Sequence, residues 1–100
     1  PDRSTRSWSI ALPVMMISEV GGQTPDGYDG LLTQVGPALT AAQGFILHAS
    51  HPTDAGWRVV EIWETREDAA RFFAAAIAPR LPQGIRPKLT FVPLHDVLRP

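Results

Sequence analysis

The chain contains no cysteine, and this absence excludes several classes of chemistry at once. Without a thiol there can be no disulfide, no cysteine nucleophile and no thiolate metal site. The 100 residues also carry little net charge, −1 at neutral pH, and lysine and arginine form no cluster. We therefore expect neither nucleic acid nor an anionic membrane surface as a partner, because both are bound through basic patches.

Long apolar runs are also lacking. The longest, residues 10–17, is interrupted by Pro13 and is too short to cross a bilayer. It merges into strand-like sequence without a separate cleavage region, which disfavours a signal peptide and leaves a cytoplasmic location as the expectation. The polar residues 1–9 are expected to form a flexible arm. Residues 10–100 are expected to form a single domain, since a chain of this length supports one core.

Motifs for nucleotide binding and for serine hydrolysis are missing. The sequence has no G-x-G-x-x-G, no P-loop and no G-x-S-x-G. Its three histidines, His48, His51 and His95, do not have the spacing of metal ligands. We expect no metal and no other cofactor, so an enzyme built on this chain would work with side chains alone.

The chain does contain four short segments that are apolar and rich in β-branched or aromatic residues, which is typical of strands. These are residues 14–20, 45–51, 57–63 and 88–98. Residues 52–56 lie between the second and third segments and consist of turn formers, so these two strands are predicted to form a hairpin. Pro93 indicates a bulge or an edge position in the fourth strand.

A first helix is predicted after the first strand. Thr24 is suited to cap it, with Pro25 in its first turn, and Gly36-Pro37 is expected to end it. Apolar residues recur at i, i+3, i+4 and i+7, as on one face of a helix, at Tyr28, Leu31, Leu32 and Val35.

A second helix is predicted after the third strand. Thr65 and Asp68 form a weak capping box at its start, and Pro79 and residues 82–84 end it. Its apolar face comprises Ala69, Phe72, Phe73, Ala76 and Ile77. The resulting order, β-α-β-β-α-β, predicts an α+β fold of the ferredoxin-like type. In this fold two helices cover one face of a four-stranded antiparallel sheet.

The uncovered face of this sheet is also expected to be apolar. Strict alternation along the third strand places Val60 and Ile62 on one sheet face and Val59 and Trp63 on the other. Along the second strand, Phe45 and Leu47 point to one face, and Ile46 and His48 point to the other. A sheet with one solvated face would alternate cleanly between apolar and polar residues. Since no segment of this chain is left to cover the second face, we expect a homodimer that joins two sheets face to face.

These residues also resemble a known family. Residues 24–29, 44–48, 56–64, 72–73 and 77–79 are similar to the dimeric α/β-barrel superfamily, and in particular to the antibiotic-biosynthesis-monooxygenase branch. The resemblance implies a dimeric barrel in which each subunit has a pocket between its own sheet and helices. Members include cofactor-free monooxygenases of aromatic polyketides, polyketide cyclases, lactone isomerases and haem-degrading enzymes. The Asn, Trp and His constellation of the haem degraders has no convincing match here, so haem is disfavoured.

Three residues are candidates for catalysis. His48 lies within an apolar strand, and a histidine side chain exchanges protons near neutral pH; the alternative is a core histidine held by local hydrogen bonds. Glu61 shares a strand face with apolar residues and could act as a general acid or base, or form an ion pair with a nearby arginine. Tyr28 begins the apolar face of the first helix, from which its hydroxyl could reach the pocket.

The expected substrate-binding residues are Trp63, Phe72, His95 and Ile46. Trp63 could form an aromatic wall or anchor the core, and Phe72 is predicted on the helix side of the core. Trp57 could also belong to such a wall, but it lies next to the hairpin turn, where a structural role is expected.

We therefore expect a homodimeric, cofactor-independent enzyme that acts on an apolar, ring-containing or polyketide-like metabolite. General acid–base chemistry of the cyclase or isomerase type would serve this substrate, with His48 as the proton-transfer residue. One alternative is a cofactor-free monooxygenase of the antibiotic-biosynthesis type. Another is a non-catalytic dimer that binds a small molecule.

Overall fold

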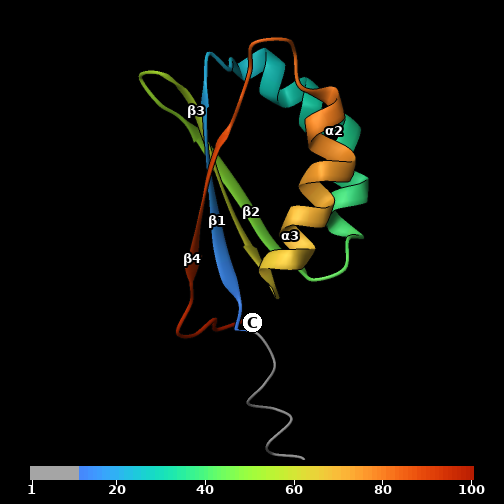
Figure 1. The fold of residues 1–100 in the computed structure, drawn as a ribbon, viewed down its shortest axis with the longest axis vertical. Helices are drawn as coiled ribbons and strands as arrows, with labels where there is room; N and C mark the ends of the chain where they lie inside the picture. Colours follow the sequence, from blue (N-terminus) through green and yellow to red (C-terminus); the bar gives the residue numbers. More distant parts are fainter. Residues whose placement is uncertain (1–11) are drawn as a thin grey trace, which may run out of the picture.

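The computed structural model describes residues 12–100, so the expected flexible arm of residues 1–9 lies outside the described part. The elements are β1 (Val14–Gly21), α2 (Pro25–Thr40), β2 (Phe45–Pro52), β3 (Gly56–Trp63), α3 (Arg66–Phe72) and β4 (Lys88–Pro93). The strands form one sheet in the order β2-β3-β1-β4, with antiparallel neighbours throughout. The predicted α+β, ferredoxin-like order is confirmed (Figure 1).

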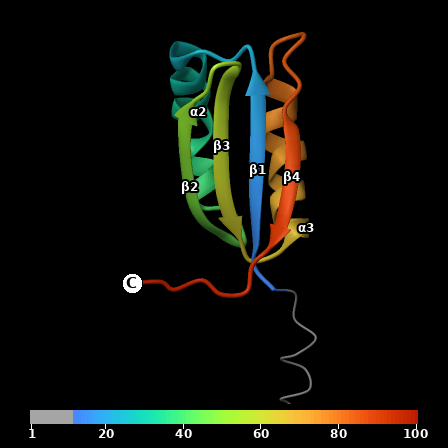
Figure 2. The same ribbon diagram turned by 90° about the vertical axis from the view of Figure 1, so that its left-hand side faces the viewer.

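Both helices lie on the same face of the sheet (Figure 1). Figure 2, which looks onto the opposite face, shows α2 behind the β2 side of the sheet and α3 behind the β4 side. The middle strands β1 and β3 therefore face the region where the two helices meet. Among residues 12–100 no helix has both the length and the apolar character needed to cross a membrane.

The helix starts follow the sequence prediction. Thr24 Oγ1 accepts a hydrogen bond from the Gly27 N–H at 3.1 Å, and Thr65 Oγ1 accepts one from the Asp68 N–H at 3.0 Å. Each threonine thereby satisfies one of the N–H groups that a helix start leaves without a partner. The Asp68 carboxylate does not complete a capping box but accepts a hydrogen bond from Arg71 at 2.8 Å.

Helix α2 is longer than expected. It was predicted to end at Gly36-Pro37, but it continues through Pro37 to Thr40. Proline removes one N–H donor and costs a helix interior about 3 kcal/mol. The extra turn places Leu39 in the core, where only 3% of its surface stays exposed. Burying a leucine contributes about 1.5–3 kcal/mol, enough to offset most of that cost.

The second helix changes geometry part-way along. Regular α-helix ends at Phe72, and the chain continues as a π-helical turn over Phe73–Ile77 and a 3₁₀ turn over Ala78–Arg80. The Ala78 N–H donates to the Phe73 carbonyl, the i→i+5 bond of a π-turn. Such π-turns are frequent at functional sites.

Strand β4 is shorter than expected. It was predicted to reach Leu98 but ends at Pro93, which lies opposite Val14 at the start of β1. Beyond Pro93 there is no further β1 residue for the chain to pair with. His95 consequently lies outside the strand, with an exposed side chain.

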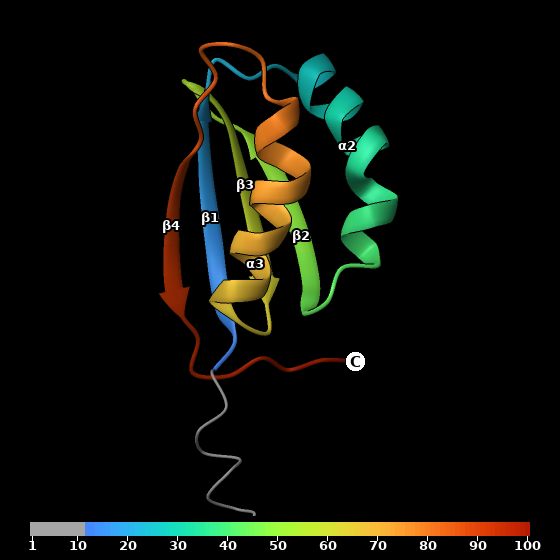
Figure 3. The same ribbon diagram turned by 45° about the vertical axis from the view of Figure 1, so that its right-hand side comes forward.

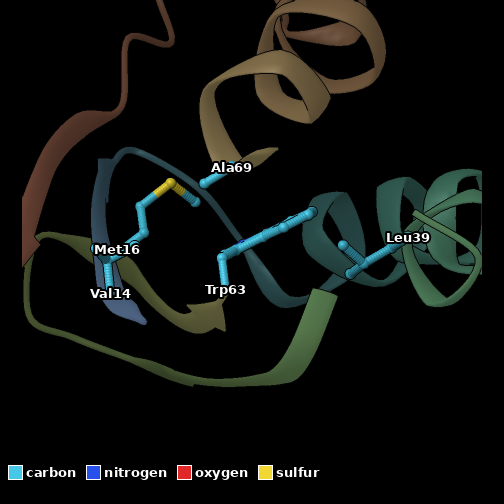
Figure 4. Close-up of a cluster of buried hydrophobic side chains, with 5 residues drawn as sticks. All are labelled: Val14, Met16, Leu39, Trp63 and Ala69. Carbon is cyan, nitrogen blue, oxygen red and sulfur yellow. The ribbon is translucent and has the colours of Figure 1, made fainter. Parts of the chain in front are cut away.

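The core lies at the end of the sheet where Val14 pairs with Trp63. Figure 4 shows its buried cluster, which consists of Val14, Met16, Leu39, Trp63 and Ala69. Trp63 is fully buried, and its ring packs edge-on against Phe45, with 5.5 Å between the ring centroids. Its other ring neighbour is Phe72, at 5.7 Å.

The register shifts in β2 between Phe45 and Leu47, which corrects the strict alternation expected there. Phe45 lies opposite Trp63 and His48 lies opposite Glu61. Because the extra residue, Ile46, restarts the alternation, Phe45 and His48 share the helix-facing side. This irregularity decides on which face of the sheet the imidazole lies.

The opposite face of the sheet has an apolar centre. Register and alternation place Met15, Ile17, Val60, Ile62 and Leu47 on it. Leu47, with 51% of its surface exposed, lies beside the other apolar residues of this face, and contiguous apolar patches are typical of interaction surfaces. The expectation of two apolar sheet faces agrees with this arrangement.

Candidate functional site

One cavity is lined by residues of the sheet and of both helices. Figure 3 shows how these elements are arranged. The volume of the cavity is about 70 Å³, which is room for several waters. Most of the wall is apolar, from α2 (Leu31, Leu32, Val35, Leu39), from the second helix and its π-turn (Ala69, Phe72, Phe73, Ile77), and from the sheet (Met16, Val20, Val59).

The polar groups of the cavity come mainly from adjacent strands. His48 on β2 and Glu61 on β3 are directly opposed, and Ser18 on β1 lies in the next row, opposite Val59. The His48 and Glu61 side chains are only 16% and 8% exposed. Two ionisable groups are thus held next to each other against an apolar space, where water does not compete for their hydrogen bonds.

Four side chains form one continuous series of hydrogen bonds. Trp63 Nε1–H donates to Glu61 Oε1 at 2.9 Å, and Glu61 Oε2 lies 2.7 Å from His48 Nδ1. His48 Nε2 in turn lies 2.5 Å from the Tyr28 hydroxyl oxygen. The series leads from the core, through the sheet, to the start of α2.

The direction of these hydrogen bonds follows from their fixed donor. An indole N–H can only donate, so Glu61 accepts at Oε1, and as a carboxylate it also accepts at Oε2. The proton of a neutral His48 ring then lies on Nδ1, and the lone pair lies on Nε2, where the Tyr28 hydroxyl donates. This arrangement presents a basic nitrogen on the cavity side and holds it in one tautomer.

Tyr28 is the one residue of this series that α2 contributes. Burial raises the pKa of its hydroxyl above the ordinary value, and the charges of Glu61 and Asp29 raise the pKa further. The Ser50 side chain lowers it by hydrogen bonding, without cancelling these effects. Tyr28 is therefore a hydrogen-bond donor at neutral pH and above. Its ring stacks on Trp57, with 4.9 Å between centroids.

The structure brings together the three residues that were expected to be catalytic, His48, Glu61 and Tyr28. All three line the cavity. Of the residues expected to bind substrate, Phe72 lines the cavity, whereas Trp63, Ile46 and His95 do not belong to its wall as described. Trp63 instead lies in the core, where its indole N–H orients Glu61.

Ser18 lines the cavity but was not singled out from the sequence. Trp57 also lines it, although a structural role was preferred for this residue over a place in the pocket wall. A signal for both was available, because alternation along β1 and β3 puts them on the same sheet face as Glu61. The indole nitrogen of Trp57 is buried, and within residues 12–100 it has no hydrogen-bond partner.

Among the described residues, no group of three or more histidine, aspartate or glutamate side chains is close enough together to hold a metal ion. Comparisons of this chain with protein-family models, with curated proteins and with solved structures found no match. The function is therefore inferred from the residues that line the cavity.

Proposed function

We propose that this protein is a cofactor-independent enzyme that removes a proton from an apolar, ring-containing or polyketide-like small molecule. The observation that carries the proposal is the series Trp63–Glu61–His48–Tyr28, which ends at an apolar cavity. A general base needs a fixed lone pair, a group that holds its tautomer and a site from which water is excluded. His48, Glu61 and the cavity wall supply these three requirements.

The reaction begins at a carbon next to a carbonyl group. His48 Nε2 takes the proton from this carbon as the C–H bond breaks. The electron pair forms a carbon–carbon double bond, and the carbonyl π electrons move onto the oxygen to give an enolate. For this step the Tyr28 hydroxyl transfers its hydrogen bond from Nε2 to the substrate oxygen. Glu61 stabilises the imidazolium that forms.

The enolate then determines the product. Return of the proton to a different carbon gives an isomer, and attack of the enolate carbon on a second carbonyl closes a ring. An electron-rich aromatic enolate that reacted with dioxygen would instead give the monooxygenase chemistry. We favour the first two outcomes, because proton transfer alone accounts for them and the cavity supplies the groups for it.

We further propose that the protein belongs to the dimeric α/β-barrel superfamily, in its antibiotic-biosynthesis-monooxygenase branch. The ferredoxin-like topology and the position of the cavity between sheet and helices support this assignment. The sheet face away from the helices has an apolar centre. A sheet that is covered on both faces is apolar on both, so this open face supports a second copy of the chain as its cover.

Exchange of α-hydrogens with deuterium tests the proposed proton abstraction. 2-Tetralone is a suitable probe, since it is a bicyclic ketone with an acidic C–H and little polarity. Proton NMR in D₂O would measure its exchange with and without the protein. We expect the wild-type protein to accelerate exchange, and His48→Gln to lose about 10²- to 10⁴-fold of that acceleration.

His51→Gln is the matched control, because this histidine is exposed, and within residues 12–100 its ring bonds the adjacent Pro52 carbonyl and Arg58. It should exchange deuterium at the wild-type rate. Equal activity of His48→Gln and wild type would contradict the proposal, and so would an absence of acceleration by wild type. Uptake of dissolved oxygen during turnover would indicate the monooxygenase reaction instead.

A further inference from the structure

The wall of the cavity includes a residue with a buried hydrogen-bond donor that has no partner within residues 12–100. Trp57 is 9% exposed, and its Nε1–H is the one buried side-chain nitrogen or oxygen of residues 12–100 without a partner. An indole N–H can only donate, so it needs an acceptor. Leaving a buried donor unsatisfied is costly, and native structures contain few such groups. This one belongs to a residue of the cavity wall.

Three other donors of the site are already engaged. The Tyr28 hydroxyl lies against His48 Nε2, His48 Nδ1 lies against Glu61, and Trp63 Nε1 donates to Glu61. Ser18 and Gln23 also line the cavity, but Trp57 carries the buried donor that has no partner among residues 12–100. Its ring stacks on that of Tyr28, which places the two aromatic groups on one side of the cavity.

We infer that Trp57 Nε1–H anchors an acceptor oxygen of the substrate, so that the ligand is a small ring compound bearing a carbonyl or phenolic oxygen. An apolar hydrocarbon of the same shape would leave this N–H unsatisfied. An oxygenated ring compound satisfies it and brings its oxygen beside the Tyr28 ring. This inference rests on the proposed function, because it names the class of substrate for the same site.

A matched pair of ligands isolates the anchor. 2-Tetralone and tetralin have the same bicyclic skeleton and differ in one carbonyl oxygen. Their dissociation constants would be measured by titration calorimetry for wild type, Trp57→Phe and Ser18→Ala. Trp57→Phe keeps an aromatic ring but removes the N–H, and Ser18→Ala removes another polar group of the same cavity.

We expect the ratio of the two dissociation constants, ketone over hydrocarbon, to rise about 10-fold in Trp57→Phe and by less in Ser18→Ala. An unchanged ratio in Trp57→Phe overturns the inference, and so does a ratio that responds only to Ser18→Ala. Failure of wild type to bind either compound overturns it as well.

A spectroscopic measurement on wild type keeps the test valid if Trp57→Phe does not fold. The indole N–H signal of Trp57 in a ¹H–¹⁵N spectrum should move downfield and exchange more slowly with 2-tetralone but not with tetralin. An equal response to both ligands would mean that water satisfies the N–H. Ketone preference without deuterium exchange would contradict the proposed function alone, and exchange without ketone preference would contradict the anchor alone.

Discussion

His48 and Glu61 are directly opposed on neighbouring antiparallel strands, and His48 Nδ1 lies 2.7 Å from Glu61 Oε2. Each residue comes from a sequence segment that is otherwise apolar. The pairing gives each of these two buried polar groups a hydrogen-bond partner, which removes the cost of burying either one alone. It also holds the imidazole in one orientation, which the proposed general base catalysis requires.

Replacing Glu61 with glutamine should reverse the tautomer of His48. Trp63 Nε1–H only donates, so the amide oxygen must face Trp63 and the amide NH₂ must face His48 Nδ1. His48 would then accept at Nδ1 and carry its proton on Nε2, which removes the basic lone pair from the cavity. We expect deuterium exchange of 2-tetralone to fall by about 10²- to 10⁴-fold.

Long-range ¹H–¹⁵N NMR would report the tautomer of the same variant directly. Glu19→Gln is the control, since Glu19 is a half-exposed carboxylate paired with Arg58 at 2.6 Å and away from the cavity. It should keep the wild-type rate and tautomer. A Glu61→Gln protein with normal exchange would show that Glu61 does not act through His48.

The fold and the catalytic candidates could be predicted because their signals are local. Strand alternation, the caps at Thr24 and Thr65 and the hairpin formers gave the topology, and an ionisable residue inside an apolar strand marked both His48 and Glu61. Their contact could not be predicted from alternation alone. It depends on the irregularity at Ile46, which reverses the phase of β2 and has no clear sequence signature.

The errors had tertiary causes. Pro37 is a local helix-ending signal, but burial of Leu39 outweighs it. Strand β4 ends at Pro93, opposite the first residue of β1, Val14. Nothing in residues 94–98 themselves indicates this end. Trp63 was placed on the correct face, yet whether it borders the cavity or the core depends on the packing of Phe45 and Phe72 around it.

Tyr28 should titrate above the ordinary tyrosine pKa. Burial is the main cause of the raised pKa; the Ser50 hydrogen bond, which lowers the pKa, comes next, and the charges of Glu61 and Asp29 add smaller increases. Since Tyr28 is the only tyrosine of the chain, absorbance at the phenolate band during an alkaline titration reports it alone. Ser50→Ala should raise the pKa further, and Glu61→Gln should lower it.

The raised pKa also sets a stability dependence on pH. The folded state holds the Tyr28 proton more tightly than the unfolded state does, so this contribution to stability is complete below the unfolded pKa. It is lost as the pH rises through the folded pKa. The denaturant midpoint of wild type should therefore fall at alkaline pH more steeply than that of Tyr28→Phe. Parallel curves for the two proteins would contradict the assignment.

Gly44 and Gly84 offer a matched test of packing at the start of the site strand. Both have positive φ, +84° and +89°, a conformation that costs other residues about 1–2 kcal/mol. A Cβ on Gly44 would also collide with the Asp68 carboxylate, whereas one on Gly84 would meet nothing within 4 Å. We expect Gly44→Ala to lower the free energy of unfolding by about 1–3 kcal/mol more than Gly84→Ala. Chemical denaturation measures both values, and equal losses would mean that the Asp68 side chain moves aside freely.

The proposed dimer predicts that one charge on the open sheet face should separate the subunits. Ile62 lies on the central strand β3, on the face that Figure 2 presents to the viewer. A lysine there would be buried without a partner in both copies, which is costly for a charge. We expect Ile62→Lys to raise the dimer dissociation constant by about 100-fold or more, measured by sedimentation velocity over a concentration series. Gln34→Lys, on the exposed side of α2, should leave the constant unchanged. If wild type sediments as a monomer at every concentration, a second copy does not cover this face, and the dimer must be abandoned.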